Sequence, residues 1–359
     1  MRAASGDILF LLPAFVGYFV MACLMDYHVT TIHPGTFSTA TSRSTSLAAT
    51  APAPPATTTT GVARPTTVAA ALLGKGTCIR MESPLQSGLC NQIYKLIGLA
   101  SQHPRDGSMW VLPRFGSDIH FQPNRFVPFH EMFDVATFSS HVATQNIDVV
   151  PENRANLNCT VRKGDGWSLF AGYRRALISG TVPADMENAV LLGLKLVPRL
   201  QRYVDSAAAF LGPSYGCLHA RIENDMVNHI KQKGGRLPNF LQLLNGMERV
   251  EEIRNTSVFY VAVGKYISPA NSALITNSSP WGARMVRASP CNLTYTECAL
   301  IDLSICRGGA WFVGYSGSTF SLLLAEYMNL DKGTGWYSAC PEGLTYLTNR
   351  GLTSGICHL

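Results

Sequence analysis

The sequence predicts an α/β fold built from two Rossmann-like halves with a ligand cleft between them. Short apolar strands alternate with amphipathic helices, and this alternation occurs as two series that are divided near residues 205–214. Such alternation is typical of parallel sheets covered by helices. Of the 359 residues, 47% are hydrophobic and 9% aromatic, which is enough for a substantial core and excludes a wholly disordered chain.

The first series runs from residue 77 to residue 211. A short β-like segment leads through a Ser/Pro/Gly loop into a helix, whose apolar residues recur at helical spacing, and then into another strand. The expected elements are a strand at 77–81, a helix at 89–103, a strand at 108–113, an amphipathic stretch at 127–140, and a helical pattern over 187–211 that Pro198 interrupts.

The second series begins after the helix-breaking sequence GPSYG at 212–216. Its apolar runs are short and are separated by amphipathic segments, as in the first series. The expected strands lie at 217–222, 258–264, 283–288 and 310–315, and the expected helices lie at 239–253 and 318–329.

The N-terminus predicts a membrane anchor. Ile8 to Met25 form a run of eighteen residues without a charge, preceded by Arg2 and followed by Asp26. A membrane span needs roughly 20 apolar residues, whereas the core of a cleaved signal peptide has about 7–15. A retained single-pass anchor is therefore favoured, with a cleaved signal peptide as the alternative. Because the positive charge precedes the run, a type II orientation in the Golgi or ER membrane, with a lumenal head, is expected.

A low-complexity stem follows the apolar run. Residues 34–70 contain 29 Ser, Thr, Ala or Pro residues out of 37, a composition that cannot bury enough surface to fold and that is typical of O-glycosylated stalks. The predicted organisation is a cytosolic tail at 1–7, a transmembrane anchor at 8–25, a disordered stem at 26–75, an N-terminal Rossmann-like domain at 76–205, and a C-terminal Rossmann-like domain at 206–359 that binds the ligand.

Cysteines and glycosylation sequons agree with a lumenal head. Nine cysteines follow the anchor without any CxxC pair, which favours disulfides over structural zinc. Cys217 lies in the apolar run YGCLHA and is expected to be a buried thiol, while Cys340 and Cys357 could form a local bridge. The Asn-x-Ser/Thr sequons lie at Asn158, Asn255, Asn277 and Asn292.

Three polar motifs stand at the junctions between predicted strands and helices. SGLCNQ, residues 87–92, places a glycine at a strand-to-helix turn, where backbone can approach a ligand closely and the helix N-terminus favours an anion. HARIENDM, residues 219–226, follows an apolar strand, and ligands of open α/β sheets bind at the carboxyl ends of strands.

The third motif, VGYSGSTFS at 313–321, runs from a strand into a predicted helix, where Ser318 or Thr319 could serve as the N-cap. Alternation along the second motif's strand puts His219 and Arg221 on one face, with Glu223 next if the strand continues. The guanidinium of Arg221 suits a phosphate. Each motif alone could also be an ordinary turn, a surface ion pair or a helix cap. Only the combination of the three motifs indicates a ligand site.

Taken together, these motifs resemble the protein O-fucosyltransferase superfamily. His-x-Arg-x-Glu-x-Asp-Met is similar to its signature, SGLCNQ occupies the place of its first glycine/asparagine loop, and GSTFS matches its C-terminal element. FHEMFDVATF and the segment ALIDLSICRGGAWFVG, which contains Asp302, add weaker similarities. The resemblance spans residues 77–330 and implies a two-domain GT-B enzyme that uses GDP-fucose, inverts the anomeric centre and needs no metal. The chain indeed lacks an Asp-x-Asp pair.

The resemblance also implies roles for individual residues. Arg221 would bind the β-phosphate and stabilise the departing GDP, His219 would contact the nucleotide or phosphate, and Asp302 would hydrogen-bond the guanine edge or ribose. The remaining donor contacts would come from Gly88, Leu89 and Asn91 on the N-terminal side, and from Ser318, Thr319 and Phe320 on the C-terminal side.

The general base remains open in the sequence. Some family members carry a glutamate in the first loop, but PLQSGLCNQ has no carboxylate. Glu223, Asp225 and Glu82 are the candidates, or no side-chain base is needed and Asn91 orients the acceptor.

The leading hypothesis is therefore a GDP-sugar-dependent transferase with a protein or glycan acceptor. The alternatives are a catalytically inactive carbohydrate-binding or scaffold protein, an adhesion protein, and a transferase with another nucleotide sugar. A nucleic-acid partner is not expected, because the net charge of +6 is spread without a basic run longer than two residues.

Overall fold

The structure is a computed structural model that describes residues 77–117, 125–154, 159–162, 184–220, 239–263, 269–278, 281–286, 292–315, 317–340 and 343–348. Contacts divide the chain into the units Met1–Pro65 and Thr66–Leu359, and all described residues belong to the second unit. None of the helices within these ranges is both long and apolar enough to cross a membrane. The predicted anchor at 8–25 and the predicted stem at 26–75 lie outside the described residues.

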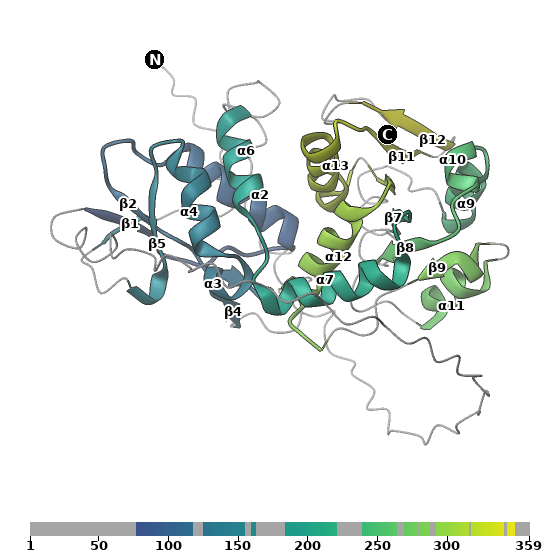
Figure 1. The fold of residues 1–359 in the computed structure, drawn as a ribbon. Helices are drawn as coiled ribbons and strands as arrows, with labels where there is room; N and C mark the ends of the chain where they lie inside the picture. Colours follow the sequence, from purple (N-terminus) through teal and green to yellow (C-terminus); the bar gives the residue numbers. More distant parts are fainter. Residues whose placement is uncertain are drawn as a thin grey trace, which may run out of the picture. The chain divides into compact units, whose positions relative to one another are not determined.

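The N-terminal half of the described residues forms a four-stranded parallel sheet with the strand order β5-β2-β1-β6. The strands are β1 (Cys78–Met81), β2 (Met109–Val111), β5 (Asp148–Val150) and β6 (Thr160–Arg162). Beside them lie α2 (Leu89–Ser101), α4 (Val135–Ala143) and α6 (Ala184–Gly193), as Figure 1 shows. Smaller elements are β3 (Phe115–Gly116), β4 (Phe126–Val127), α3 (Phe129–Met132) and a 3-10 turn at Glu152–Arg154.

The C-terminal half forms a six-stranded sheet with the order β12-β11-β10-β7-β8-β9, in which only the β11–β12 pair is antiparallel. Its strands are β7 (Gly216–His219), β8 (Phe259–Ala262), β9 (Met285–Val286), β10 (Trp311–Gly314), β11 (Trp336–Cys340) and β12 (Gly343–Leu347). The helices are α7 (Pro198–Leu211), α9 (Phe240–Glu248), α10 (Glu251–Arg254), α11 (Pro269–Asn277), α12 (Tyr295–Gly308) and α13 (Thr319–Lys332), with a 3-10 turn at Gly282–Arg284.

Local sequence explains where several of these helices begin and end. Pro198, expected as an interruption, occupies the first turn of α7, where its missing N–H has no intrahelical partner to lose. Asn239 and Thr294 close capping boxes at the starts of α9 and α12. At the end of α13, Gly333 adopts φ +63°, a left-handed conformation that glycine accepts without strain.

The largest hydrophobic cluster contains residues of both halves. Leu96 of α2 and Trp110 of β2 belong to the same cluster as Cys217 of β7 and Phe312 of β10. Along β7 the next residue, Leu218, belongs to a second cluster on the opposite face of the C-terminal sheet. Successive side chains therefore alternate between two buried faces, as expected for a sheet covered on both sides.

The predicted α/β architecture with parallel sheets is confirmed. The helix expected at 318–329 is α13, the strand expected at 310–315 is β10, and the helix expected at 239–253 is divided into α9 and α10 near Val250. The sequence did not predict β5, β6, β11 or β12. The proposed boundary between residues 205 and 206 falls within α7, which packs against α12.

The prediction that Cys217 is a buried thiol is wrong. Cys217 forms a disulfide with Cys306 of α12, across 89 residues of sequence. Both residues lie in the large hydrophobic cluster, so the apolar surroundings of Cys217 reflected a buried disulfide. Among the described residues, Cys90 on α2 is a buried thiol. A separation of this length leaves no local spacing signal, and connectivity could not be read from the sequence.

The structure also describes a second disulfide and three of the sequon asparagines. Cys78 is bonded to Cys159, which joins β1 to the segment that enters β6. Cys340 is also disulfide-bonded, and its predicted partner, Cys357, lies outside the described residues. Asn255, Asn277 and Asn292 are all exposed, and Asn158 lies outside the described residues.

Candidate functional site

The C-terminal end of β7 places an imidazole against the first turn of α13. His219 is the last residue of β7 and is only 4% exposed. Its Nδ1 lies 2.9 Å from Oγ of Ser321, and its ring lies 4.4 Å from the ring of Phe320, measured between centroids. His219, the first residue of the motif at 219–226, therefore contacts the motif at 313–321, which agrees with the prediction that these motifs belong to one site.

Ser321 is the polar residue that holds this arrangement together. Its Oγ accepts a hydrogen bond from the backbone N of Tyr315, at 3.0 Å, in addition to its contact with His219. The close approach depends on Gly314, because a Cβ at that position would lie 2.4 Å from both the Phe312 ring and the Ser321 Oγ. Ser321 lies within the motif at 313–321 but was not among the predicted site residues. Its position in the first turn of the helix, three residues after the N-cap, is the sequence signal that could have identified it.

The first turn of α13 suits an anion. Ser318 is the N-cap residue, as predicted, but its side chain makes no capping hydrogen bond. Thr319 and Phe320 are the next two residues, and the first turn contains no acidic side chain. The N-terminus of a helix presents backbone N–H groups and a partial positive charge. A negatively charged ligand would therefore be stabilised at this position.

The first glycine loop enters α2 in a comparable way. Gly88 is the N-cap residue of α2, with no side-chain cap, and Leu89 is buried. The left-handed residue of this loop is Ser87, with φ +91°, and not the glycine. A Cβ at Gly88 would meet no atom within 4 Å, so the space beside it is open. The Oδ1 of Asn91 is buried and has no hydrogen-bond partner within the described residues.

Helices of the two motifs contact each other. The hydroxyl of Tyr94 on α2 donates to Oε1 of Glu326 on α13, at 3.2 Å. Glu326 is 3% exposed and Tyr94 is 4% exposed, so this bond lies in the interior. It fixes the helix that begins at Leu89 against the helix that begins at Thr319.

Asp302 lies on α12, ahead of Cys306 and β10 in the sequence. Its Oδ1 accepts a short hydrogen bond from the hydroxyl of Tyr260 on β8. One helical turn later, Cys306 of the same helix is bonded to Cys217 of β7. Tyr260 was not anticipated as a partner, because its strand and α12 are far apart in the sequence.

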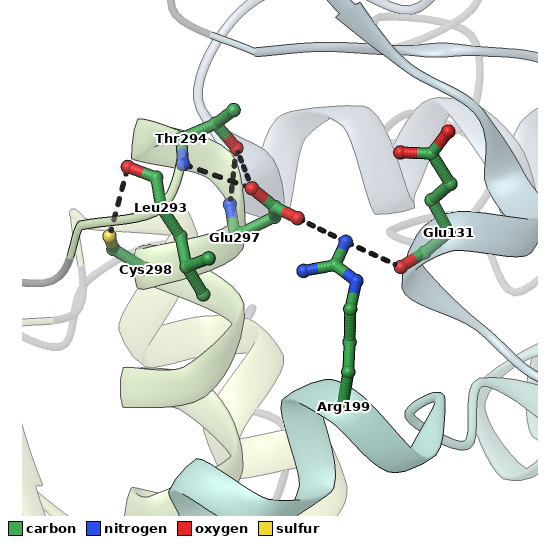
Figure 2. A network of polar contacts seen from close by, with 6 residues as sticks. All are labelled: Glu131, Arg199, Leu293, Thr294, Glu297 and Cys298. Carbon is green, nitrogen blue, oxygen red and sulfur yellow. Dashed lines mark hydrogen bonds and ion pairs between the residues drawn. The ribbon is translucent and has the colours of Figure 1, made fainter.

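A second polar network joins α7, α3 and α12 (Figure 2). Arg199 donates to the backbone O of Glu131 at 2.9 Å and forms a short ion pair with Oε1 of Glu297. The other carboxylate oxygen of Glu297 accepts from the N and Oγ1 of Thr294, at 2.9 and 2.7 Å. Burial acts to raise the pKa of Glu297, but the Thr294 hydrogen bonds and the Arg199 charge outweigh it and lower that pKa.

Several predicted residues are not placed. Arg221, Glu223 and Asp225 lie outside the described residues. Glu82, the other candidate base, is exposed just after β1. Within the described part of the chain, no group of three or more His, Cys, Asp or Glu side chains could hold a metal ion.

A groove of about 600 Å³ lies away from these motifs, between α9 and α11. Leu241 and Leu274 line it together with Trp281, and none of the predicted site residues does. We take the motif-bearing ends of β7, α2 and α13 as the candidate site, since ligand sites of α/β sheets lie at such ends.

The comparisons with known proteins support the fold. No model of a known protein family matches the chain, and no curated protein matches it in sequence. POFUT1 in complex with GDP-fucose is 14% identical, with a TM-score of 0.50 over 71% of this chain and 94% of that chain. Fucosyltransferase NodZ from Bradyrhizobium is also 14% identical, with a TM-score of 0.50 over 76% and 99%.

A further structure, NodZ alpha-1,6-fucosyltransferase soaked with GDP-fucose, is 12% identical, with a TM-score of 0.51 over 77% of this chain and 100% of that chain. At these identities the likeness establishes the fold alone. The resemblance to fucosyltransferases that the motifs indicated is thus confirmed at the level of the fold.

Proposed function

We propose that this chain is an inverting glycosyltransferase that moves L-fucose from GDP-fucose to a hydroxyl group of a protein or glycan. One observation carries the proposal. On a fold shared with solved fucosyltransferases, His219 at the end of β7 is joined through Ser321 to the N-terminal turn of α13. A helix N-terminus and an adjacent imidazole are both groups that can bind an anionic nucleotide sugar.

The first turn of α13 would bind the pyrophosphate. Its N–H groups and the absence of acidic side chains favour negative charge there. Because Ser321 Oγ already accepts the Tyr315 amide, its own proton is available to Nδ1 of His219. In that tautomer Nε2 of His219 carries a proton and would donate to the nucleotide or its phosphate. Ser318, Thr319 and Phe320 would complete the contacts to phosphate and sugar.

Arg221 would stabilise the leaving group. In the reaction the acceptor oxygen bonds to C1 of fucose on the face opposite the β-phosphate oxygen, and the bond from C1 to that oxygen breaks. The electron pair leaves with GDP, so negative charge grows on the β-phosphate. A guanidinium beside it is the group that stabilises this charge most directly.

The loop before α2 would serve the acceptor side. Gly88 and Leu89 would line the donor. The Oδ1 of Asn91, which has no hydrogen-bond partner within the described residues, would accept a hydrogen bond from the incoming hydroxyl. The proton of that hydroxyl passes to a base, for which Glu223 is our choice, with Asp225 and Glu82 as alternatives. If the transition state is sufficiently dissociative, the proton is lost late and Asn91 alone orients the acceptor.

Asp302 would bind the guanine edge or the ribose. Its hydrogen bond from Tyr260 and the disulfide one turn further along α12 both restrain the position of its carboxylate. A restrained acceptor of this kind can discriminate guanine from a base that lacks matching donors.

We further propose that the enzyme acts without a metal and works in the lumen of the Golgi or ER, held by the span at 8–25. The described disulfides, the exposed sequon asparagines and the apolar run support that location. No nucleic-acid partner is proposed.

A second candidate function is carbohydrate binding without catalysis on the same fold. The observation that favours it is the lack of a carboxylate in PLQSGLCNQ. It predicts persistent glycan binding with no turnover of any sugar nucleotide.

The test incubates the purified full-length chain with GDP-fucose, GDP-mannose and UDP-N-acetylglucosamine, each with and without EDTA, and measures the nucleoside diphosphate released. We expect GDP from GDP-fucose, unaffected by EDTA. Arg221→Ala should lower the rate by about tenfold or more, while Arg202→Ala, a change of an exposed arginine on α7, should not. Release of UDP alone would contradict the donor assignment, and no release at all would favour the non-catalytic candidate.

A further inference from the structure

Two fully buried polar side chains on one face of α2 hold the loop that precedes it. Gln92 is 0% exposed and Lys95 is 2% exposed, and they lie three residues apart, on the same side of the helix. Burying an amide or an ammonium group is costly unless its hydrogen bonds are satisfied. Polar residues in such positions therefore call for a structural or functional reason.

Both side chains donate hydrogen bonds to the loop. Lys95 Nζ donates to the backbone O of Gln86 at 2.6 Å and to Oγ of Ser87 at 3.1 Å. Gln92 Nε2 donates to the backbone O of Ser87 at 2.6 Å. The two side chains thus hydrogen-bond to Gln86 and Ser87, the two residues immediately before Gly88.

Ser87 needs this support because of its backbone. Its φ of +91° lies in a region that residues with a Cβ rarely adopt, at a cost of about 1–3 kcal/mol. Such a conformation persists only where the surroundings determine it. Here the determining contacts come from Lys95 and Gln92, and the result is a fixed direction for the chain as it enters the first turn of α2.

The same network reaches the C-terminal half. Gln92 Oε1 accepts from the N of Gly116 at 2.9 Å, and its Nε2 also donates to the O of Gly116 at 3.2 Å. That carbonyl in turn accepts from Oγ1 of Thr296 on α12, at 2.5 Å. Thr296 is 1% exposed, so an interior chain of hydrogen bonds runs from α12 through Gly116 and Gln92 to Ser87.

We propose that Gln92, Lys95 and Thr296 are positioning residues that hold the 85–88 loop, and with it Gly88 and Asn91, in the geometry the reaction needs. The part of this inference that concerns reaction rests on the proposed function. Most of the proposed nucleotide contacts come from the C-terminal half, and Gly88 and Leu89 supply only part of the donor's lining. Loss of the contacts that hold the loop should therefore impair turnover of GDP-fucose much more than binding of GDP.

The first experiment compares Lys95→Met, which keeps the side-chain length but removes the donors, with Lys195→Met at an exposed lysine. Hydrogen exchange of the full-length chain reads the loop without any assumption about activity. We expect exchange in the peptide covering 85–91 to rise about tenfold in Lys95→Met and to stay unchanged in Lys195→Met. Unchanged exchange in Lys95→Met would overturn the inference.

The second experiment measures GDP affinity by calorimetry and the rate at which the protein hydrolyses GDP-fucose, with water as the acceptor. Lys95→Met should lower kcat/KM about tenfold or more while the Kd for GDP changes less than about threefold, because misplacement of a positioned group costs rate before it costs nucleotide binding. Equal losses of rate and of GDP binding would contradict the positioning role.

Thr296→Val is the companion variant in case Lys95→Met does not fold. It removes only the hydroxyl bond to Gly116 and should show the same separation of rate from GDP affinity, with a smaller loss of about threefold. If the unmodified chain turns over no sugar nucleotide while hydrogen exchange still responds to Lys95→Met, the proposed function fails and the positioning of the loop stands.

Discussion

Oγ of Ser321 lies 2.9 Å from Nδ1 of His219, so the first turn of α13 sets the orientation of the imidazole at the end of β7. The hydroxyl also accepts the backbone N–H of Tyr315, which follows β10. One side chain therefore joins three elements at the place where the proposed pyrophosphate site begins.

Ser321→Ala should weaken both stability and nucleotide binding. The buried N–H of Tyr315 loses its acceptor, which should lower the free energy of unfolding by about 1–3 kcal/mol. Without its partner at Nδ1, the His219 ring is no longer fixed, and the affinity for GDP should fall about tenfold. Denaturant unfolding and calorimetry measure the two effects. Ser206→Ala, at an exposed residue of α7, is the control, and equal behaviour of the two variants would refute the role of Ser321.

Gly314→Ala should destabilise the C-terminal half. The new methyl group would lie 2.4 Å from the Phe312 ring and from Ser321 Oγ, both of which are fully buried. Relief requires movement of packed side chains, at a cost of about 1–3 kcal/mol or more. Gly317→Ala is the matched control, because a Cβ there meets nothing within 4 Å. A thermal melt in which both variants unfold together would show that the close packing at Gly314 is unimportant.

Glu297 should make stability depend on pH in the acid range. Its pKa is lower in the folded chain than the ordinary value of a glutamate, so the unfolded chain binds protons first as the pH falls. The stabilising contribution is present above the unfolded pKa and is lost as the pH falls through the folded pKa. Glu297→Gln should therefore flatten the loss of stability between about pH 5 and pH 3.

The control for this prediction is Glu251→Gln at an exposed residue of α10. Urea unfolding at several pH values gives the slope for each variant. An unchanged slope in Glu297→Gln, relative to the unmodified chain, would mean that the contacts of Glu297 with Thr294 and Arg199 do not lower its pKa in the folded chain.

The Cys217–Cys306 disulfide should make a large contribution to stability. It closes a loop across a sequence separation of 89 residues and joins β7 to α12. Replacing both cysteines by alanine should lower the free energy of unfolding by about 2–5 kcal/mol. Differential scanning calorimetry of the double variant measures this, and a melting temperature equal to that of the unmodified chain would argue that the disulfide is not formed.

Much of the fold was accessible from the sequence because the elements that carry the motifs are bounded by strong local signals. Apolar runs that are preceded or followed by Gly and Ser predicted β7, β10 and α13 to within a few residues. The edge strands β6 and β12 are short and only partly buried, and they lack an alternating pattern. Their places depend on pairing with distant strands, which local sequence does not encode.

The site could be predicted in part for the same reason. His219 and Phe320 belong to compact motifs, and the structure joins them. The partners that fix the motifs escaped prediction, because Tyr260 and Thr296 act through contacts distant in sequence. For Cys217, burial was predicted correctly, but the disulfide with Cys306 could not be predicted from the sequence.

Calorimetric titration of the full-length chain with GDP, and separately with UDP, tests the central claim most directly. We predict saturable binding of one GDP per chain, at least about tenfold weaker binding of UDP, and a loss of GDP affinity of about tenfold or more in Arg221→Ala. Equal affinity for the two nucleotides, or unchanged GDP binding in Arg221→Ala, would contradict a GDP-sugar site at the end of β7.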